Sequence, residues 1–209
     1  MNAPAPAAKQ RLVVGISGAS GVILGIRLLE YLQHSAEYEA HLVLSAAAKT
    51  TMAAETDWAV KDVEALAAHV YDNRDIGAAP ASGSFPTRGM VIIPASIKTL
   101  SGVANSYAAD LLTRAADVTL KEGRPLILVL RETPFHLGHL RLMQQAAEAG
   151  AVIFPPVPAF YARPRTVDDI IDNTVGRVLF RLGIENELFA RWQGLRAAAL
   201  AKRDTPPGA

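Results

Sequence analysis

Residues 11–21 constrain the fold more than any other part of the sequence. The apolar residues from Leu12 to Ile16 form the short, nearly unbroken run that is typical of a buried parallel strand. Small residues end this run, and an amphipathic helical pattern begins at Val22. A strand, a tight turn and a helix in this order open a nucleotide-binding α/β unit, because the helix N-terminus offers free N–H groups and a partial positive charge to a phosphate.

The glycine spacing in this turn narrows the class of ligand. Gly15, Gly18 and Gly21 match neither G-x-G-x-x-G nor G-x-x-x-x-G-K-[ST], and the missing lysine argues against an NTP-hydrolysing loop. The second strand runs into Ser45 instead of the acidic residue that holds a ribose in dinucleotide sites. The pattern favours a mononucleotide over NAD, and a turn that merely packs tightly remains as the alternative.

Composition excludes several classes of protein. The chain has 209 residues, 50% of them hydrophobic, which suits one domain with a full-sized core. The net charge of +1 indicates no general affinity for nucleic acid or an anionic membrane. Without cysteine there are no disulfides, thiolate metal sites or cysteine nucleophile, and the five histidines show no metal-ligand spacing. No apolar run is long enough to cross a bilayer, so we expect a cytoplasmic protein.

Alternating apolar runs and helical patterns predict the architecture. Strands are expected at residues 12–16, 41–44, 89–94, 125–130 and 151–154. Helices are expected at 46–55, 60–70, 111–120, 139–149, 167–182 and 187–202, with a surface loop over 72–88. This order predicts a single Rossmann-like (flavodoxin-like) α/β domain with a doubly wound, mostly parallel sheet and helices on both faces. We expect a flexible extension at 1–10, the domain at 11–185, and a C-terminal helix and tail at 186–209.

Candidate functional residues follow the strands, because ligands of such sheets bind beyond the carboxyl ends of the strands. Small hydroxyl residues recur at these ends, together with Arg131 and Glu132. A buried carboxylic acid at Glu132 would hold a raised pKa and shuttle a proton, whereas a solvated ion pair is the alternative. Tyr161 and Arg163 combine a phenol with a guanidinium, which suits a phosphate oxyanion.

Six motifs in the same order resemble the UbiX (Pad-type) flavin prenyltransferases. The resemblance runs from about residue 11 to 193, and its motifs are residues 15–21, 96–102, 112–118, 120–122, 131–134 and 156–161. It implies binding of reduced FMN and dimethylallyl phosphate, with the prenyl group joined to N5 and C6 of the flavin. The product would serve UbiD-type decarboxylases in ubiquinone biosynthesis or aromatic-acid decarboxylation.

The resemblance also implies residue roles and an assembly. FMN would be held by Gly18, Ala19, Ser20, Ser45, Ser96, Ile97, Lys98, Thr99 and Arg131. The prenyl phosphate would be held by Arg114, Lys121, Tyr161 and Arg177, the last reached across a subunit boundary. Ser20 and Glu132 would move protons, Lys121 would act on the phosphate, and Glu55 would help to close the site.

Family members form dodecamers, so a homo-oligomer is expected, with no metal, nucleic acid or membrane insertion. Two other functions remain open: an FMN carrier or accessory subunit of a decarboxylase, and an FMN-dependent decarboxylase. The choice between a monophosphate and a diphosphate donor, and between packing and interface roles for Trp192, is also open.

Overall fold

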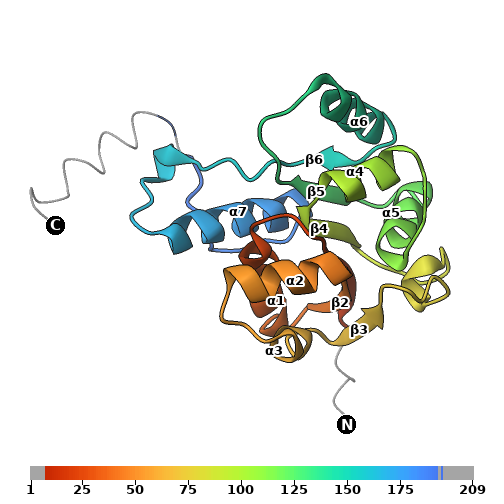
Figure 1. Cartoon of the computed structure of the whole chain (residues 1–209). Helices are drawn as coiled ribbons and strands as arrows, with labels where there is room; N and C mark the ends of the chain where they lie inside the picture. The colour runs from red at the N-terminus through yellow and green to blue at the C-terminus, as the bar shows by residue number, and fades with distance from the viewer. Residues whose placement is uncertain (1–7, 193, 195–209) are drawn as a thin grey trace, which may run out of the picture.

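The computed structural model describes residues 8–192 and 194, and its helices and strands alternate along the chain (Figure 1). The strands are β1 (Gln10–Ile16), β2 (Tyr38–Leu44), β3 (His69–Asp72), β4 (Gly89–Ala95), β5 (Leu126–Leu130) and β6 (Val152–Ile153). The α-helices are α1 (Val22–Gln33), α2 (Ala46–Glu55), α3 (Val60–Glu64), α4 (Ile97–Ala104), α5 (Leu111–Lys121), α6 (Leu137–Glu148) and α7 (Val167–Arg181). Short 3-10 turns lie at η1 (Ala79–Ala81) and η2 (Phe160–Ala162).

In the described part of the chain the strands form one six-stranded sheet in the order β3-β2-β1-β4-β5-β6. Every strand pair is parallel, so the sheet is more regular than the mostly parallel one expected from the sequence. The chain winds outward from β1 in one direction and then from β4 in the other, and this reversal lies between β1 and β4. The predicted doubly wound α/β fold is therefore confirmed.

Helices cover both faces of the sheet because successive strand side chains point to opposite sides. Leu12, Val14 and Ile16 pack into the core shared with α1 and α7, whereas Val13 packs into the core shared with α4, α5 and α6. Figure 1 shows these two groups of helices on either side of the strands. The helices α5 and α7, which carry predicted substrate-binding cations, thus lie on opposite faces of the sheet.

The predicted helix over residues 60–70 is wrong in its second half. Helix α3 ends at Glu64, and Ala68 donates its backbone N–H to the carbonyl of Ala40 in β2, 3.1 Å away. The chain then forms β3, which pairs with β2 in register, His41 beside His69. This edge strand has four residues, mostly exposed, so it carries no apolar alternation by which the sequence would have revealed it. Its pairing with β2 outweighs the helical spacing of the apolar residues.

The C-terminal prediction is also corrected. Residues 187–192 are not helical, so the predicted helix does not begin at Glu187. Its remainder, apart from Gly194, lies outside the described residues. Among the helices that the structure describes, none combines the length and apolar character needed to span a bilayer.

Candidate functional site at the carboxyl edge of the sheet

The turn after β1 is fastened to the turn after β4 by one buried hydroxyl. Ser17, which is 1% exposed, donates its Oγ–H to the carbonyl of Pro94 at 2.9 Å. The same oxygen accepts a hydrogen bond from the backbone N–H of Ser96 at 2.7 Å. Since these two turns follow the central strands β1 and β4, Ser17 holds together the point at which the winding of the sheet reverses.

Two glycines give this turn its close packing. A Cβ on Gly18 would lie 2.4 Å from the Cβ of Ala47, so only glycine lets the turn approach the start of α2 this closely. Gly21, at the N-cap of α1, has a φ of 94°, a left-handed conformation that glycine adopts at little cost. Gly18 thus lets the β1 turn pack against α2, and Gly21 lets the backbone turn into α1.

The starts of α2 and α4 are capped by serines. Ser45 accepts a hydrogen bond from the N–H of Ala48 at 3.0 Å, and Ser96 accepts one from the N–H of Thr99 at 3.3 Å. Serine is favoured at such positions because its oxygen satisfies one of the free N–H groups of the first turn. The remaining free N–H groups and the helix dipoles make both helix starts suited to an anion.

A cavity of about 660 Å³ opens between these elements. Five of the predicted FMN-binding residues line it: Gly18, Ser45, Ser96, Lys98 and Thr99. Its other lining residues include Ser17, Ala46, Ala47, Asn73, Ser101, Gly102, Asn105, Tyr107, Ala109, Asp110, Leu112 and Thr113. The volume falls within the range of about 300–1,000 Å³ that is usual for small-molecule sites.

Two of the residues that line this cavity, Asn73 and Asp110, were not predicted from the sequence. Asn73 follows the unpredicted strand β3, and its side-chain oxygen accepts the N–H of Leu112 at 2.9 Å, which holds the start of α5 against the cavity. Asp110 caps α5 and forms a capping box with Thr113. The Asp110-x-x-Thr113 spacing was a signal that could have located this helix start.

Ser20 and Glu55 form a second group beside the cavity, and the charge of Arg131 acts on Glu55. Glu55 accepts a hydrogen bond from the N–H of Gly21 at 2.8 Å and another from the Ser20 side chain. Partial burial raises the pKa of Glu55, but these hydrogen bonds and the charge of Arg131 outweigh it, so the pKa lies below its usual value. The carboxylate at the end of α2 is thus ionised and anchored to the start of α1.

The other residues predicted to bind FMN do not line the cavity. Ala19 is buried, and Ile97 packs against the core on the α4 side. Glu132, the second residue after β5, is partly exposed and not buried as expected, and its carboxylate accepts a hydrogen bond from the backbone N–H of Thr133 at 3.0 Å. Arg131 donates its backbone N–H to the carbonyl of Ala95 at 3.1 Å, which ties the end of β5 to β4.

The predicted prenyl-phosphate residues do not converge within one chain. On α5, Arg114 pairs with Asp117 at 3.0 Å and Lys121 pairs with Glu122. Lys121 ends α5 and is followed closely by the start of β5, so it lies toward the amino edge of the sheet, away from the cavity.

The other two prenyl-phosphate residues lie across the sheet from α5. Arg177 lies on α7, and it lines a cavity of about 320 Å³ together with Phe154, Val157 and Asn173. Tyr161, in η2, is 45% exposed and contacts Trp192 edge to face, with ring centroids 5.6 Å apart.

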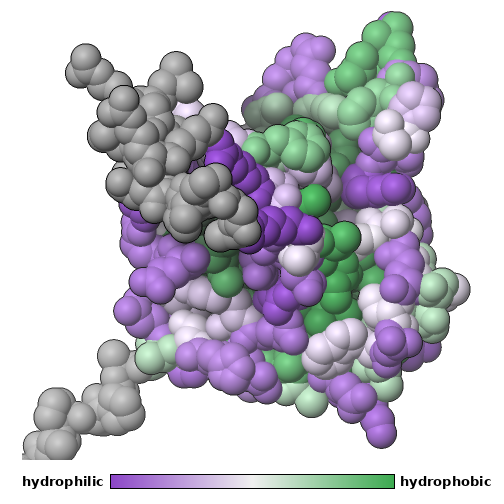
Figure 2. Space-filling view, turned by 90° about the vertical axis from the view of Figure 1, so that its left-hand side faces the viewer, coloured by the Kyte–Doolittle hydropathy of each residue, from purple (hydrophilic) through white to green (hydrophobic). Residues whose placement is uncertain are grey.

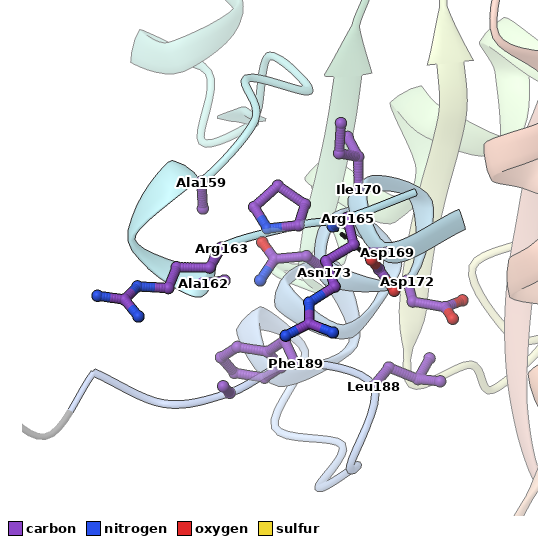
Figure 3. A pocket seen from close by; sticks show the side chains of 12 residues that line it. Ala159, Ala162, Arg163, Arg165, Asp169, Ile170, Asp172, Asn173, Leu188 and Phe189 are labelled. Carbon is purple, nitrogen blue, oxygen red and sulfur yellow. Dashed lines mark hydrogen bonds between the residues drawn. The ribbon is translucent and has the colours of Figure 1, made fainter. Parts of the chain in front are cut away.

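A further pocket of about 280 Å³ lies between η2, the start of α7 and residues 188–190 (Figure 3). Arg163 and Arg165 border it, and the backbone N–H of Arg165 donates to Asp169 at 2.7 Å. In Figure 3 the guanidinium of Arg163 points away from the pocket and that of Arg165 lies near Phe189. Arg163, which the sequence suggested for a phosphate together with Tyr161, lines this pocket, whereas Tyr161 and the residues assigned to FMN by the family resemblance do not.

Comparisons with known proteins agree with this geometry. The chain matches the Flavoprotein family over residues 2–179. It is 62% identical over 187 residues to the flavin prenyltransferase UbiX of Escherichia coli K12. The aligned region covers 88% of this chain and 99% of that protein.

Two solved structures are also similar. AnUbiX, in complex with FMN and dimethylallyl pyrophosphate, superposes with a TM-score of 0.87 at 45% identity over 90% of this chain and 99% of that one. A dodecameric FMN-dependent UbiX-like decarboxylase from Escherichia coli O157:H7 superposes with a TM-score of 0.86 at 48% identity over 88% of this chain and 100% of that one. From its sequence, its fold and the residues at its sheet edge, the chain belongs to the UbiX family of flavin prenyltransferases.

Proposed function

We propose that this protein transfers a dimethylallyl group from dimethylallyl phosphate to reduced FMN, forming bonds to N5 and C6 of the flavin. The prenylated flavin would then be used by a UbiD-type decarboxylase, in ubiquinone biosynthesis or in aromatic-acid decarboxylation. The observation that carries the proposal is the cavity of about 660 Å³ into which two serine-capped helix starts open.

The residues of this cavity fit FMN. A flavin mononucleotide needs an anion site for its phosphate, and the starts of α2 and α4 with Ser45, Ser96 and Thr99 supply N–H and O–H donors. It also needs a flat apolar surface for its ring, and Leu112 and the alanines of the wall supply one. Lys98, at the first turn of α4, adds a positive charge.

The transfer reaction needs cations near the second substrate. Breaking the allylic C–O bond leaves the electron pair on the phosphate and positive charge on the carbon, which the electron-rich reduced flavin attacks. Lys121, Arg114 and Arg177 would stabilise the departing phosphate, with Tyr161 donating a hydrogen bond. Glu132 and Ser20 would move the protons released near N5 and taken up by the phosphate, and Glu55 would hold Ser20 in place.

These groups come together only in an assembly, because one chain places α5 and α7 on opposite faces of the sheet. We therefore propose a homo-oligomer of the dodecameric kind, with each site completed by neighbouring copies. Large apolar side chains are exposed on the loops and helices that would form contacts, among them Leu137 at 61%, Val157 at 72% and Phe160 at 75%. Figure 2 shows hydrophobic residues reaching the surface among hydrophilic ones on one face. Such exposure is typical of a contact surface.

The test of the reaction is anaerobic incubation of the protein with reduced FMN and dimethylallyl phosphate, followed by mass spectrometry of the released flavin. Flavin heavier by one dimethylallyl unit is the expected result. Parallel reactions with the diphosphate decide which donor is used. Unmodified FMN with both donors would overturn the proposed transfer and leave the carrier function.

A second candidate is an FMN-dependent decarboxylase, favoured by the similarity of this chain to the FMN-dependent UbiX-like decarboxylase of Escherichia coli O157:H7. The two activities separate cleanly in one experiment. A decarboxylase releases CO₂ from an aromatic acid when this protein and FMN are the only additions. A prenyltransferase supports CO₂ release only when a UbiD-type apoenzyme and the prenyl donor are also present, and we expect the second pattern.

The proposal that sites are shared between copies has its own test. Lys121→Ala and Arg177→Ala chains, each inactive alone, are coexpressed with different affinity tags and the hybrid oligomers are purified. If the two residues of one site come from different copies, some sites of a hybrid contain both intact residues and activity returns. If both come from one chain, every site carries a defect and no activity returns.

A further inference from the structure

A polar cluster lies on β2 and β3, away from the cavity at the carboxyl edge. Glu39 and His41 are two residues apart on β2 and so share one face of the sheet, and His69 is the residue of β3 that pairs with His41. Within the described residues, one group of three or more potential metal-ligating side chains comes together, and it is this one. One potential ligand atom from each of the three residues lies within 4.8 Å of the other two.

The atoms are close to the spacing of a metal site. Nε2 of His41 lies 3.1 Å from Oε1 of Glu39. Two ligand atoms bound to one tetrahedral Zn²⁺, at 2.0–2.2 Å each, are about 3.3–3.5 Å apart. His69 is exposed and at present stacks on His41, with ring centroids 4.7 Å apart. A change of its side-chain torsions, which its position at the sheet edge allows, would turn a ring nitrogen toward the other two ligands.

Tyr71 completes the arrangement. Its hydroxyl lies 2.8 Å from Nδ1 of His41. A metal on Nε2 requires the ring proton to sit on Nδ1, where it would be donated to the Tyr71 oxygen. An oriented partner on the second nitrogen is the usual support of a metal-bound histidine.

We propose that Glu39, His41 and His69 form a binding site for a divalent transition-metal ion, with Zn²⁺ as the best match to two imidazoles and one carboxylate. A water molecule would take the fourth position, on the exposed side of His69. This site is separate from the proposed prenyl transfer and does not depend on it. It would fasten the short edge strand β3 to β2, and β3 leads directly to Asn73, the residue that holds α5 against the cavity.

The positive charge of Arg11 opposes the binding of a cation to Glu39. Arg11 lies 3.5 Å from Glu39, and its guanidinium also covers the ring of Phe85, 4.8 Å from the ring centroid. A Zn²⁺ ion must compete with Arg11 for the carboxylate. Arg11→Gln removes this competition and is expected to tighten Zn²⁺ binding.

The test is titration of the tag-free, full-length protein with ZnCl₂ by calorimetry, and with CoCl₂ by visible absorption, since tetrahedral Co²⁺ with nitrogen ligands absorbs strongly. We expect one Zn²⁺ per chain. His69→Ala and Glu39→Gln should each weaken Zn²⁺ binding at least tenfold, as loss even of a residue that orients a ligand costs about 10–100-fold. His34→Ala, an exposed histidine at the end of α1, is the matched control and should bind Zn²⁺ as the wild type does.

FMN binding measured on the same variants separates local loss from misfolding. His69→Ala and Glu39→Gln should keep FMN binding within about twofold, since neither residue lines the cavity. Absence of stoichiometric Zn²⁺ binding by the wild type would overturn the site, and so would unchanged Zn²⁺ affinity in both His69→Ala and Glu39→Gln.

Discussion

The cavity at the carboxyl edge and the cations of α5 and α7 are built in different ways. The walls of the cavity are fastened to one another within one chain: Ser17 joins two turns, Ser45 and Ser96 cap two helices, and Gly18 lets these parts touch. By contrast, Lys121 and Arg177 lie on helices that cover opposite faces of the sheet. Under the proposed roles of these residues, we expect flavin binding to depend on the fold of one chain, and binding of the prenyl phosphate to depend on the contact between copies.

The largest effect that would sharpen this comparison is expected at the cations and the proton-transfer group. Lys121→Ala and Glu132→Gln should each lower the rate of prenyl transfer by about 10²–10³-fold, since removing one preorganised electrostatic group from a transition state costs about that much. FMN affinity should stay within about twofold, because neither residue lines the cavity. Single-turnover assays and flavin fluorescence titration measure the two quantities.

Lys61→Ala is the control for these variants, because Lys61 is an exposed lysine on α3 away from the cavity. It should change neither the rate nor the affinity. Loss of FMN binding in parallel with turnover in Lys121→Ala would contradict the division between the two regions.

The next effect is expected at Gly18, on the flavin side of the comparison. In Gly18→Ala the new methyl group meets Ala47, and overpacking of this kind costs about 1–3 kcal/mol. We expect a lower free energy of unfolding, measured in urea, and weaker FMN binding. The double variant Gly18→Ala/Ala47→Gly removes the clash and should recover most of the loss; failure to recover would show that Gly18 serves some need other than this contact.

The smallest effect is expected at Glu55, which joins the end of α2 to the start of α1. Its folded-state pKa lies below the usual value of about 4.3, so its carboxylate stabilises the fold at neutral pH. This contribution is present above the unfolded-state pKa and is lost as the pH falls through the lower folded-state value.

Urea unfolding of Glu55→Gln and the wild type between pH 3 and pH 7 tests this expectation. The difference in free energy of unfolding should be at most about 1 kcal/mol at pH 7, because the group is exposed, and should shrink toward pH 3. A difference that grows as the pH falls would mean that the carboxylate destabilises the fold.

Local patterns explain which parts of the site were predictable. Ser45 stands directly after a predicted strand and directly before a predicted helix, so the strand end and the helix cap can be read together. Ser96 follows a predicted strand as well, but the helix that it caps, α4, was not among the predicted helices. Asn73 lacked such a context, because it follows a four-residue edge strand whose pattern resembles the end of a helix. The approach of Glu55 to Gly21 across 34 positions has no local signal at all.

The sequence by itself determined the alternation of strands and helices except at β3 and α4, as well as the turn of small residues after β1 and the family motifs, because each depends on neighbours in the chain. The tertiary structure alone decided which distant residues meet. Parallel pairing of β2 with β3 sets His69 beside His41, although 27 residues separate them in the chain and no metal-ligand spacing marks them. Likewise, only the winding of the sheet places α5 and α7 on opposite faces. The apolar pattern of a helix shows which of its residues are buried, but not which face of the sheet they pack against.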